Sequence, residues 1–158
     1  PWQVYMVPQF MMMRSMGLAD THLAIICLQA FSAFGVFMMK QFYEGIPTEL
    51  CEAARIDGMT EYQIWYRIML PLSKPSLSTL TIFTFVGTWN DFLGPLIYLT
   101  TESKKTLQLG LRMFISQFGS EYGLIMAASV LSLIPVLAVF LSLQKYFVEG
   151  VAASGVKG

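Results

Sequence analysis

The chain has 158 residues, of which 55% are hydrophobic and only 13% are charged, and its mean hydropathy is +0.58. These values lie well outside those of soluble globular proteins and predict a protein of the lipid bilayer. Ten basic and ten acidic residues leave no net charge. No large electrostatic field is therefore available to gather nucleic acid, and we expect no nucleic-acid partner.

Residues that could carry catalysis or bind a metal are few. Cys27 and Cys51 have no His or Cys at metal-ligand spacing, so we expect small packing residues and no metal site. No nucleophile and base can be paired with His22, and the chain lacks the G-x-x-x-x-G-K-[ST] loop that cradles phosphates. An intramembrane hydrolase would need an acidic pair, but Asp91 is the only acid in a predicted span. We expect no catalytic residue and no cofactor.

Apolar segments of about twenty residues predict where the chain crosses the bilayer. The first segment is too short to cross, and it begins on Pro1 without the pattern of a signal peptide, so we expect a span that is cut within a helix. The last segment contains Pro135, which is available to kink it. The predicted elements are a partial span at 1–16, spans at 23–43, 76–100 and 122–148, a polar segment at 44–75, a connection at 101–121 and a tail at 149–158.

The distribution of basic residues predicts an orientation. With three crossings, the polar segment and the tail share one side of the membrane, and the other connections share the opposite side. Six basic residues then fall on the side of the polar segment against four on the other. This excess favours a cytoplasmic position for residues 44–75.

The polar segment, which contains "CEAARIDGMTEYQIWYRIMLPLSKP", has the punctuation of two short helices. Pro47 suits a first helical turn, and Gly58 is suited to ending a helix in the left-handed conformation. Thr60 and Gln63 have the capping-box spacing that starts a second helix, and we expect Pro71 to end it. One face of the first helix carries Leu50, Ala53, Ala54 and Asp57, and the two alanines would leave room there for another protein's backbone. The second helix has an apolar stripe formed by Ile64, Trp65, Ile68 and Met69.

The spacing of this segment resembles a known family motif. The matching positions are Glu52-Ala53-Ala54, then Gly58 after three residues, Ile68 after nine more, and Leu70-Pro71 after one more. This pattern is similar to the EAA loop of the inner-membrane permease subunits of binding-protein-dependent ABC importers. Further similarity is to sequences of the carbohydrate-type permeases, which include the maltose and glycerol-phosphate subunits. It is carried by the stretches "TWNDFLGPLIYL", "KTLQLGL", "YGLIMAASVLSLIPV" and "GVKG". The chain resembles only the C-terminal half of an intact member.

The resemblance implies an all-α membrane domain of the ABC importer type in a bacterial inner membrane. It implies that the EAA loop is cytoplasmic and fits a groove on an ATPase subunit as a coupling helix. Glu52 would make a polar contact there and Gly58 would make the turn. It also implies ABC ATPase subunits that bind and hydrolyse ATP, a second and different permease subunit, an extracytoplasmic solute-binding protein and membrane lipid as partners. The expected coupling residues are Glu52, Ala53, Ala54, Asp57, Gly58, Ile68, Leu70 and Pro71.

Trp89, Asn90 and Asp91 are the candidate solute-path residues, because they can stack on and hydrogen-bond a polar solute within a predicted span. The alternative is that Asp91 lies near the outer interface and orders an adjoining loop. Gly94 and Pro95 are expected to break the helix locally. Residues 106–118, with Phe118 as the last apolar position, predict an interfacial helix or a docking surface for a binding protein.

Two other functions are also compatible with the sequence. The solute could be a polyamine or a phosphate ester rather than a sugar. The chain could also belong to a truncated membrane scaffold that does not transport.

Overall fold

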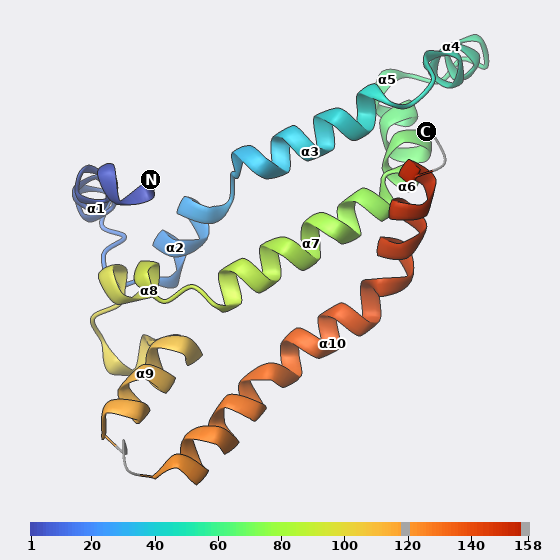
Figure 1. Cartoon of the computed structure of the whole chain (residues 1–158). Helices are drawn as coiled ribbons and strands as arrows, with labels where there is room; N and C mark the ends of the chain where they lie inside the picture. Colours follow the sequence, from blue (N-terminus) through green and yellow to red (C-terminus); the bar gives the residue numbers. More distant parts are fainter. Residues whose placement is uncertain (118–120, 156–158) are drawn as a thin grey trace. The chain divides into compact units, whose positions relative to one another are not determined.

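A computed structural model describes residues 1–117 and 121–155, and every element in these ranges is helical, as the all-α prediction requires (Figure 1). The elements labelled η1 and η3 are 3₁₀ turns, and η2 is a π-helical turn. In chain order the elements are η1 (Trp2–Val4), α1 (Met6–Ser15), α2 (His22–Gln29), α3 (Ala33–Glu44), α4 (Thr48–Ile56), α5 (Glu61–Ile64), η2 (Trp65–Met69), α6 (Leu70–Leu72), α7 (Lys74–Trp89), α8 (Leu93–Tyr98), η3 (Glu102–Lys104), α9 (Leu107–Gln117) and α10 (Tyr122–Gly155).

The helices form two compact units, of which the first comprises residues 1–31 and 86–136 and the second residues 32–85 together with the chain from 137 onward. The core of the first unit contains Met13 of α1, Ala24 of α2 and Tyr98 of α8, each at most 5% exposed. Phe10 packs against Tyr98 with ring centroids 5.7 Å apart. Burial of these apolar side chains holds α1, α2 and α8 together.

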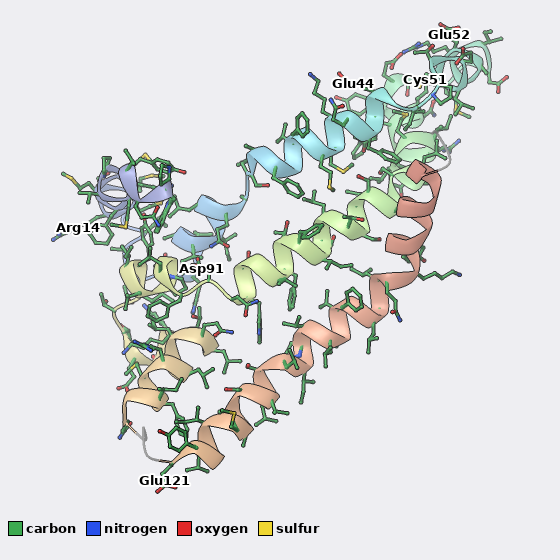
Figure 2. The ribbon with its side chains drawn as sticks, in the orientation of Figure 1. Arg14, Glu44, Cys51, Glu52, Asp91 and Glu121 are labelled. Carbon is green, nitrogen blue, oxygen red and sulfur yellow. The ribbon has the colours of Figure 1, made fainter. Side chains whose placement is uncertain are left out.

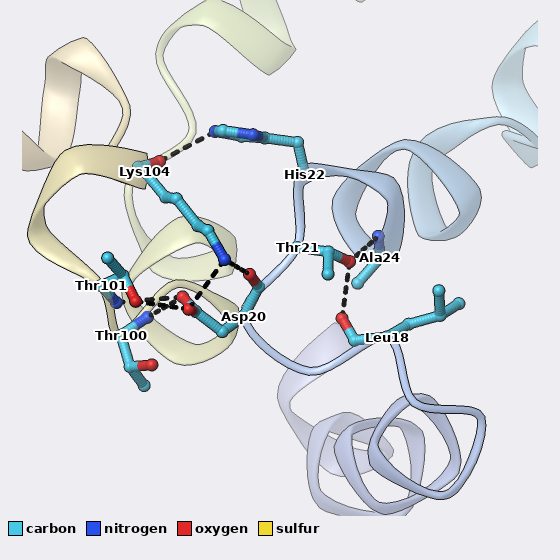
Figure 3. Close-up of polar contacts among 8 residues, drawn as sticks. All are labelled: Leu18, Asp20, Thr21, His22, Ala24, Thr100, Thr101 and Lys104. Atoms are coloured by element: carbon cyan, nitrogen blue, oxygen red, sulfur yellow. Dashed lines mark hydrogen bonds and ion pairs between the residues drawn. The ribbon is translucent and has the colours of Figure 1, made fainter.

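Asp20, in the connection between α1 and α2, makes hydrogen bonds to the segment that follows α8 (Figure 3). Its carboxylate accepts hydrogen bonds from the Thr101 hydroxyl and from the amides of Thr101 (3.0 Å) and Thr100 (2.8 Å). Lys104 Nζ lies 3.1 Å from Asp20 Oδ2, and His22 Nε2 lies 2.9 Å from the Lys104 carbonyl oxygen. Hydrogen bonds to the carboxylate, above all the one from the Thr101 hydroxyl, hold the pKa of Asp20 far below its usual range. Asp20 adopts a φ of 55°, a conformation that Asp tolerates better than most residues.

Within the second unit, α3 lies against α7. The Phe34 and Phe83 rings meet edge to face with centroids 5.9 Å apart. A Cβ at Gly35 would lie 2.8 Å from Ser32 Oγ and 3.2 Å from a Leu80 methyl carbon. Glycine therefore allows the close approach of the two helices.

The predicted span at 23–43 is interrupted, which corrects the expectation of a continuous helix. The predicted span at 76–100 is also interrupted, but at residues 90–92 and not at Gly94 and Pro95, which lie inside α8. In the first, α2 ends at Gln29 and Ser32 caps α3 by accepting a hydrogen bond from the Gly35 amide (2.9 Å). In the second, α7 ends at Trp89 and α8 begins at Leu93. Pro95 falls in the first turn of α8, where a missing N–H is tolerated; further inside one helix its ring would clash with the carbonyl four residues earlier.

The number of full spans remains a prediction. Among the described residues, one stretch, Tyr122–Tyr146 of α10, is long and apolar enough to cross a bilayer by itself, and α2 with α3 qualifies only if the pair counts as one broken span. The 16 residues of α7 extend about 24 Å, short of the roughly 30 Å hydrocarbon core. Pro135 lies inside α10, and the helix continues past the predicted boundary at 148 to Gly155.

Candidate functional site

The segment predicted to be the EAA loop (residues 44–75), which keeps that name below, contains α4, and Pro47 precedes α4 as the N-cap residue. At the other end of α4, the Gly58 amide donates to the Arg55 carbonyl and the Met59 amide donates to the Ala54 carbonyl, both at 3.0 Å. This pair of hydrogen bonds is the Schellman motif, which requires a left-handed residue at the position of Gly58. Gly58 has a φ of 79°, so the predicted left-handed glycine is confirmed.

The turn after Gly58 is fixed by two sets of polar contacts. Thr60 Oγ1 accepts from the Gln63 amide (3.4 Å) and Gln63 Oε1 accepts from the Thr60 amide (2.8 Å), which confirms the predicted capping box. Arg55 Nε and Nη2 donate to the two carboxylate oxygens of Glu61 at 2.7 and 3.3 Å. These hydrogen bonds lower the pKa of Glu61 and raise that of Arg55. The ion pair joins α4 to α5 across the turn.

The signature residues differ in their exposure. Glu52, Ala53 and Asp57 are exposed, whereas Ala54 is only 4% exposed. The expectation that both alanines leave room for another protein is therefore wrong for Ala54. It is buried within the loop because α5, with its buried Ile64, packs against α4. Ala53 alone of the pair is open to a partner.

The second helix of the loop does not end at Pro71, contrary to the expectation. A π-helical turn over Trp65–Met69 leads into α6, which contains Pro71, and helical turns continue to Leu72. The Leu70 amide bonds to the Trp65 carbonyl five residues back. This wider turn changes the carbonyl positions ahead of Pro71, which explains how the ring is accommodated. Ile68 and Leu70 are half-buried, and Pro71 is exposed.

The apolar stripe predicted for the second helix is only partly buried. Ile64 is 3% exposed, but Trp65 is 52% exposed, and Ile56 and Tyr62 are 86% and 85% exposed. Glu61, Tyr62 and Trp65 line a shallow groove. The EAA loop thus presents large apolar side chains beside its charged residues, as partner-binding surfaces do.

The solute-path candidates lie at the break between α7 and α8, and each contacts a different element. Trp89 Nε1 donates to the Ser132 carbonyl of α10 (3.1 Å). Asn90 Oδ1 accepts from Gln108 of α9 (3.2 Å). Asp91, which is labelled in Figure 2, accepts a hydrogen bond on Oδ2 from Gln29 of α2 (2.8 Å). Three consecutive residues therefore attach the break to three helices.

Asp91 makes a hydrogen bond to the start of α8 and also lines a cavity. Its Oδ1 accepts from the Gly94 amide (3.2 Å) and so satisfies the start of α8, which agrees with the loop-ordering alternative. It also lines a cavity of about 410 Å³ with Gln29 and Tyr98. Trp89 and Asn90 do not line this cavity.

Sequence reasoning did not find Gln29 and Tyr98. Gln29 is the one amide within an otherwise apolar run from Leu23, and such a polar group in a predicted span usually has a partner. That signal could have found Gln29. Tyr98 gives no comparable signal, because a tyrosine near a span end is ordinary.

The sequence also predicts that the chain has no metal site and that residues 106–118 form an interfacial helix or a docking surface. Among residues 1–117 and 121–155, no group of three or more His, Cys, Asp or Glu side chains is placed to hold a metal ion. Cys27 is exposed, and Cys51 is half-buried with its Sγ 3.8 Å from Met69 Sδ. Residues 107–117 form α9, in which Leu109 is buried. Phe118 and residues 156–158 lie outside the described residues.

Comparison with known proteins identifies the class. Residues 1–153 match the family model "Binding-protein-dependent transport system inner membrane component". The arabinooligosaccharides transport system permease AraQ of Halalkalibacterium halodurans is 39% identical over the whole chain and 57% of its own length. The lactose transport system permease LacG of Rhizobium radiobacter is 36% identical over 98% of the chain and 56% of its own length.

A solved structure supports the same class. The crystal structure of a bacterial ABC transporter involved in the import of the acidic polysaccharide alginate contains a chain with a TM-score of 0.79 and 32% identity. The match covers 89% of the present chain and 55% of that chain. The present chain belongs to the family of binding-protein-dependent transport system inner membrane components. It spans little more than half the length of the curated relatives it matches.

Proposed function

We propose that the chain is part of a permease subunit of an ATP-driven importer for a sugar or oligosaccharide. The observation that carries this proposal is the family match over residues 1–153, together with relatives whose names describe arabinooligosaccharide and lactose transport. The helical fold shared with a chain of the alginate importer adds support. Solute would pass the inner membrane through this subunit and a second, different permease subunit.

Residues 23–43, 76–100 and 122–148 are the proposed membrane crossings, and residues 1–16 form part of another. In this arrangement each of the first two crossings contains a break, at 30–32 and at 90–92. Exposed backbone at such breaks must be satisfied by protein or water. The Gly35 amide donates to Ser32 Oγ and the Gly94 amide donates to Asp91 Oδ1, and these two bonds support this placement.

The EAA loop is the proposed contact with the ATPase. Its Schellman turn and Arg55–Glu61 ion pair fix the geometry between α4 and α5. A segment fixed in this way can transmit a rigid-body displacement. Glu52, Ala53, Asp57 and Gly58 remain exposed for contact, and Ile56, Tyr62 and Trp65 supply apolar area. Ala54 acts within the loop, together with Ile68, Leu70 and Pro71 at its second helix.

ATP would be bound and hydrolysed by the partner ATPases, and an extracytoplasmic binding protein would deliver the solute. Closure of the ATPases on nucleotide would then favour one of two access states. The helix α9 is a proposed interfacial or docking element on the outer side, because it combines exposed Leu107 and Arg112 with buried Leu109.

A phosphate-ester solute is the second candidate. It is favoured by the 35% identity to the sn-glycerol-3-phosphate transport system permease UgpE of Yersinia enterocolitica, over 98% of the present chain. Polyamine transport and a non-transporting scaffold are the remaining alternatives, and no relative named above favours them.

Uptake by the reconstituted complex tests the proposal. The permease would be assembled with its partner permease, ATPases and binding protein in liposomes. Arabinotriose, lactose and glycerol 3-phosphate would be supplied with ATP. Uptake of either sugar is the expected result. Uptake of glycerol 3-phosphate alone would support the second candidate, and no uptake of any compound by a fully assembled complex would contradict both.

A further inference from the structure

A groove between α8 and α9 is lined mostly by apolar side chains. It has a volume of about 290 Å³ and lies within the first unit. The lining residues are Phe92, Leu96, Leu109, Arg112, Met113 and Ile115. Leu96 and Met113 are 48% and 37% exposed, whereas Leu109 is 3% exposed. Among the lining residues that the structure describes, none is acidic and none carries an amide or hydroxyl group, so the groove does not suit a sugar.

Two basic side chains lie at this groove. Arg112 lines it and is exposed, and Lys105 Nζ lies 3.1 Å from the sulfur of Met113, which also lines it. Among residues 1–117 and 121–155, neither Arg112 nor Lys105 forms an ion pair with a carboxylate. A guanidinium group binds phosphate oxygens at two points, and an ammonium group adds a compact charge. The groove therefore combines an apolar wall with two cationic groups.

The helix α9 has the features of a helix that lies in a membrane surface. Its 11 residues extend about 16 Å, too short to cross the roughly 30 Å hydrocarbon core. Interfacial helices bind bilayers through apolar area and through the attraction of basic residues to anionic lipids. Because the chain belongs to a family of inner membrane components, lipid is the amphiphile that such a helix meets.

A phospholipid matches both parts of the groove at once. An acyl chain would cover the apolar side chains of Phe92, Leu96 and Ile115, and the phosphate would lie at Arg112. A free phosphate would leave the apolar wall uncovered. A zwitterionic lipid carries its own cation beside the phosphate, so it complements two basic groups less well than an anionic lipid does. Basic pockets between membrane helices are known to bind anionic head groups.

We propose that the groove between α8 and α9 binds an anionic phospholipid of the surrounding bilayer. Arg112 and Lys105 bind the phosphate, and the apolar lining residues contact one acyl chain. This inference goes beyond the proposed import function, because it holds whatever solute the complex carries. It also assigns α9 to the membrane interface in preference to a docking surface for a binding protein.

Photo-labelling by lipid in the assembled complex tests the proposal. The permease, its partner permease and the ATPases would be placed in phosphatidylcholine nanodiscs with a trace of phosphatidylglycerol that carries a diazirine on one acyl chain. Mass spectrometry of peptides should find the label within residues 92–115. Unlabelled phosphatidylglycerol should displace this label. The same amount of added phosphatidylcholine should not, and neither should inorganic phosphate, which has the charge but no acyl chain.

Arg112→Gln removes the charge and keeps a long polar side chain. The amount of unlabelled phosphatidylglycerol that displaces half of the label should rise about fivefold, the effect of one basic residue on an anionic lipid. Arg14→Gln is the matched control, because Arg14 is an exposed arginine of the first unit that does not line the groove. It should leave the displacement unchanged.

Leu96→Trp tests the acyl-chain position separately from charge. Leu96 is 48% exposed, so a larger ring can occupy the groove with little disturbance of buried packing. Labelling within residues 92–115 should fall with the phosphatidylglycerol probe and with a phosphatidylcholine probe of the same design. Leu133→Trp on α10, at a residue that is 50% exposed and does not line the groove, is the control and should not reduce this label.

Two results would overturn the proposal. Equal displacement by the two lipids, unchanged in Arg112→Gln, would show that the groove holds bulk lipid without selection by charge. Absence of label within residues 92–115 would show that the groove is covered by protein, and a cross-link from α9 to the binding protein would then identify it as a docking surface. Both results are independent of uptake, because a complex that transports none of the tested solutes still reports which lipid it binds.

Discussion

Arg55 and Glu61 form a two-point ion pair across the turn at Gly58, with nitrogen–oxygen distances of 2.7 and 3.3 Å. The pair connects the last turn of α4 to the first residue of α5. Because both side chains are exposed, its contribution to global stability should be small. Its effect should instead be local, on the angle between the two helices.

Replacing Glu61 by Gln should loosen this turn. We expect faster hydrogen exchange at the Gly58 and Met59 amides in the assembled complex, with little change in thermal stability. The pKa of Glu61 is lowered by the Arg55 hydrogen bonds. Stabilisation by the pair is therefore present above the ordinary Glu pKa of about 4.3 and is lost as pH falls through the lowered value. Glu49→Gln on the same loop is the control, and equal exchange in both variants would contradict the assigned role.

Gly58→Val should weaken coupling without preventing membrane insertion. A Cβ at Gly58 would meet no atom within 4 Å, but the φ of 79° would remain, and a left-handed conformation costs a residue with a Cβ roughly 1–2 kcal/mol. We expect loss of binding-protein-stimulated ATP hydrolysis at normal expression. Gly58→Asn should retain more activity, because Asn tolerates this conformation better. Equal, full activity in both variants would exclude a need for the left-handed turn.

Ala54 and Ala53 should respond differently to the same substitution. Ala54→Asp places an unpaired charge in the buried contact of α4 with α5, so it should disorder the EAA loop even in the isolated permease. Ala53→Asp, at an exposed position, should leave the loop ordered and affect only ATPase association. Protease sensitivity of the loop in detergent measures the first effect. Similar sensitivity of the two variants would show that Ala54 is not packed internally.

Gly94→Ala should disturb the contacts of Asp91. An added Cβ would lie 2.5 Å from Asp91 Oδ2, so the carboxylate must move and its bond to Gln29 should weaken. We expect a higher KM for solute uptake with normal complex assembly. Gly87→Ala, where a Cβ meets nothing within 4 Å, is the control. An unchanged KM in Gly94→Ala would show that Asp91's position does not affect uptake.

The sequence was sufficient to predict features that depend on local chemistry. The capping box of Thr60 and Gln63 and the left-handed Gly58 each follow from a few adjacent residues, and the structure confirms them. The all-helical class, which the apolar segments and the family resemblance predict, is also confirmed. The burial of Ala54 could not be predicted, because it depends on how α5 folds back onto α4. The π-helical turn before Pro71 likewise depends on the geometry of the whole second helix. Hydropathy indicated the apolar segments but not the break at 30–32, because a few residues hardly change an average over a span. Gly94 and Pro95 indicated a break in the next span, but the observed break lies earlier, at 90–92.

Site-specific photo-cross-linking can show whether the EAA loop contacts an ATPase subunit. A photoreactive phenylalanine analogue would replace Ile56, which is 86% exposed, in the assembled complex, and a second variant would carry it at the exposed Arg112 of α9. We expect a covalent adduct between position 56 and the ATPase, and none from position 112. An ATPase adduct from position 112 with none from position 56 would contradict it.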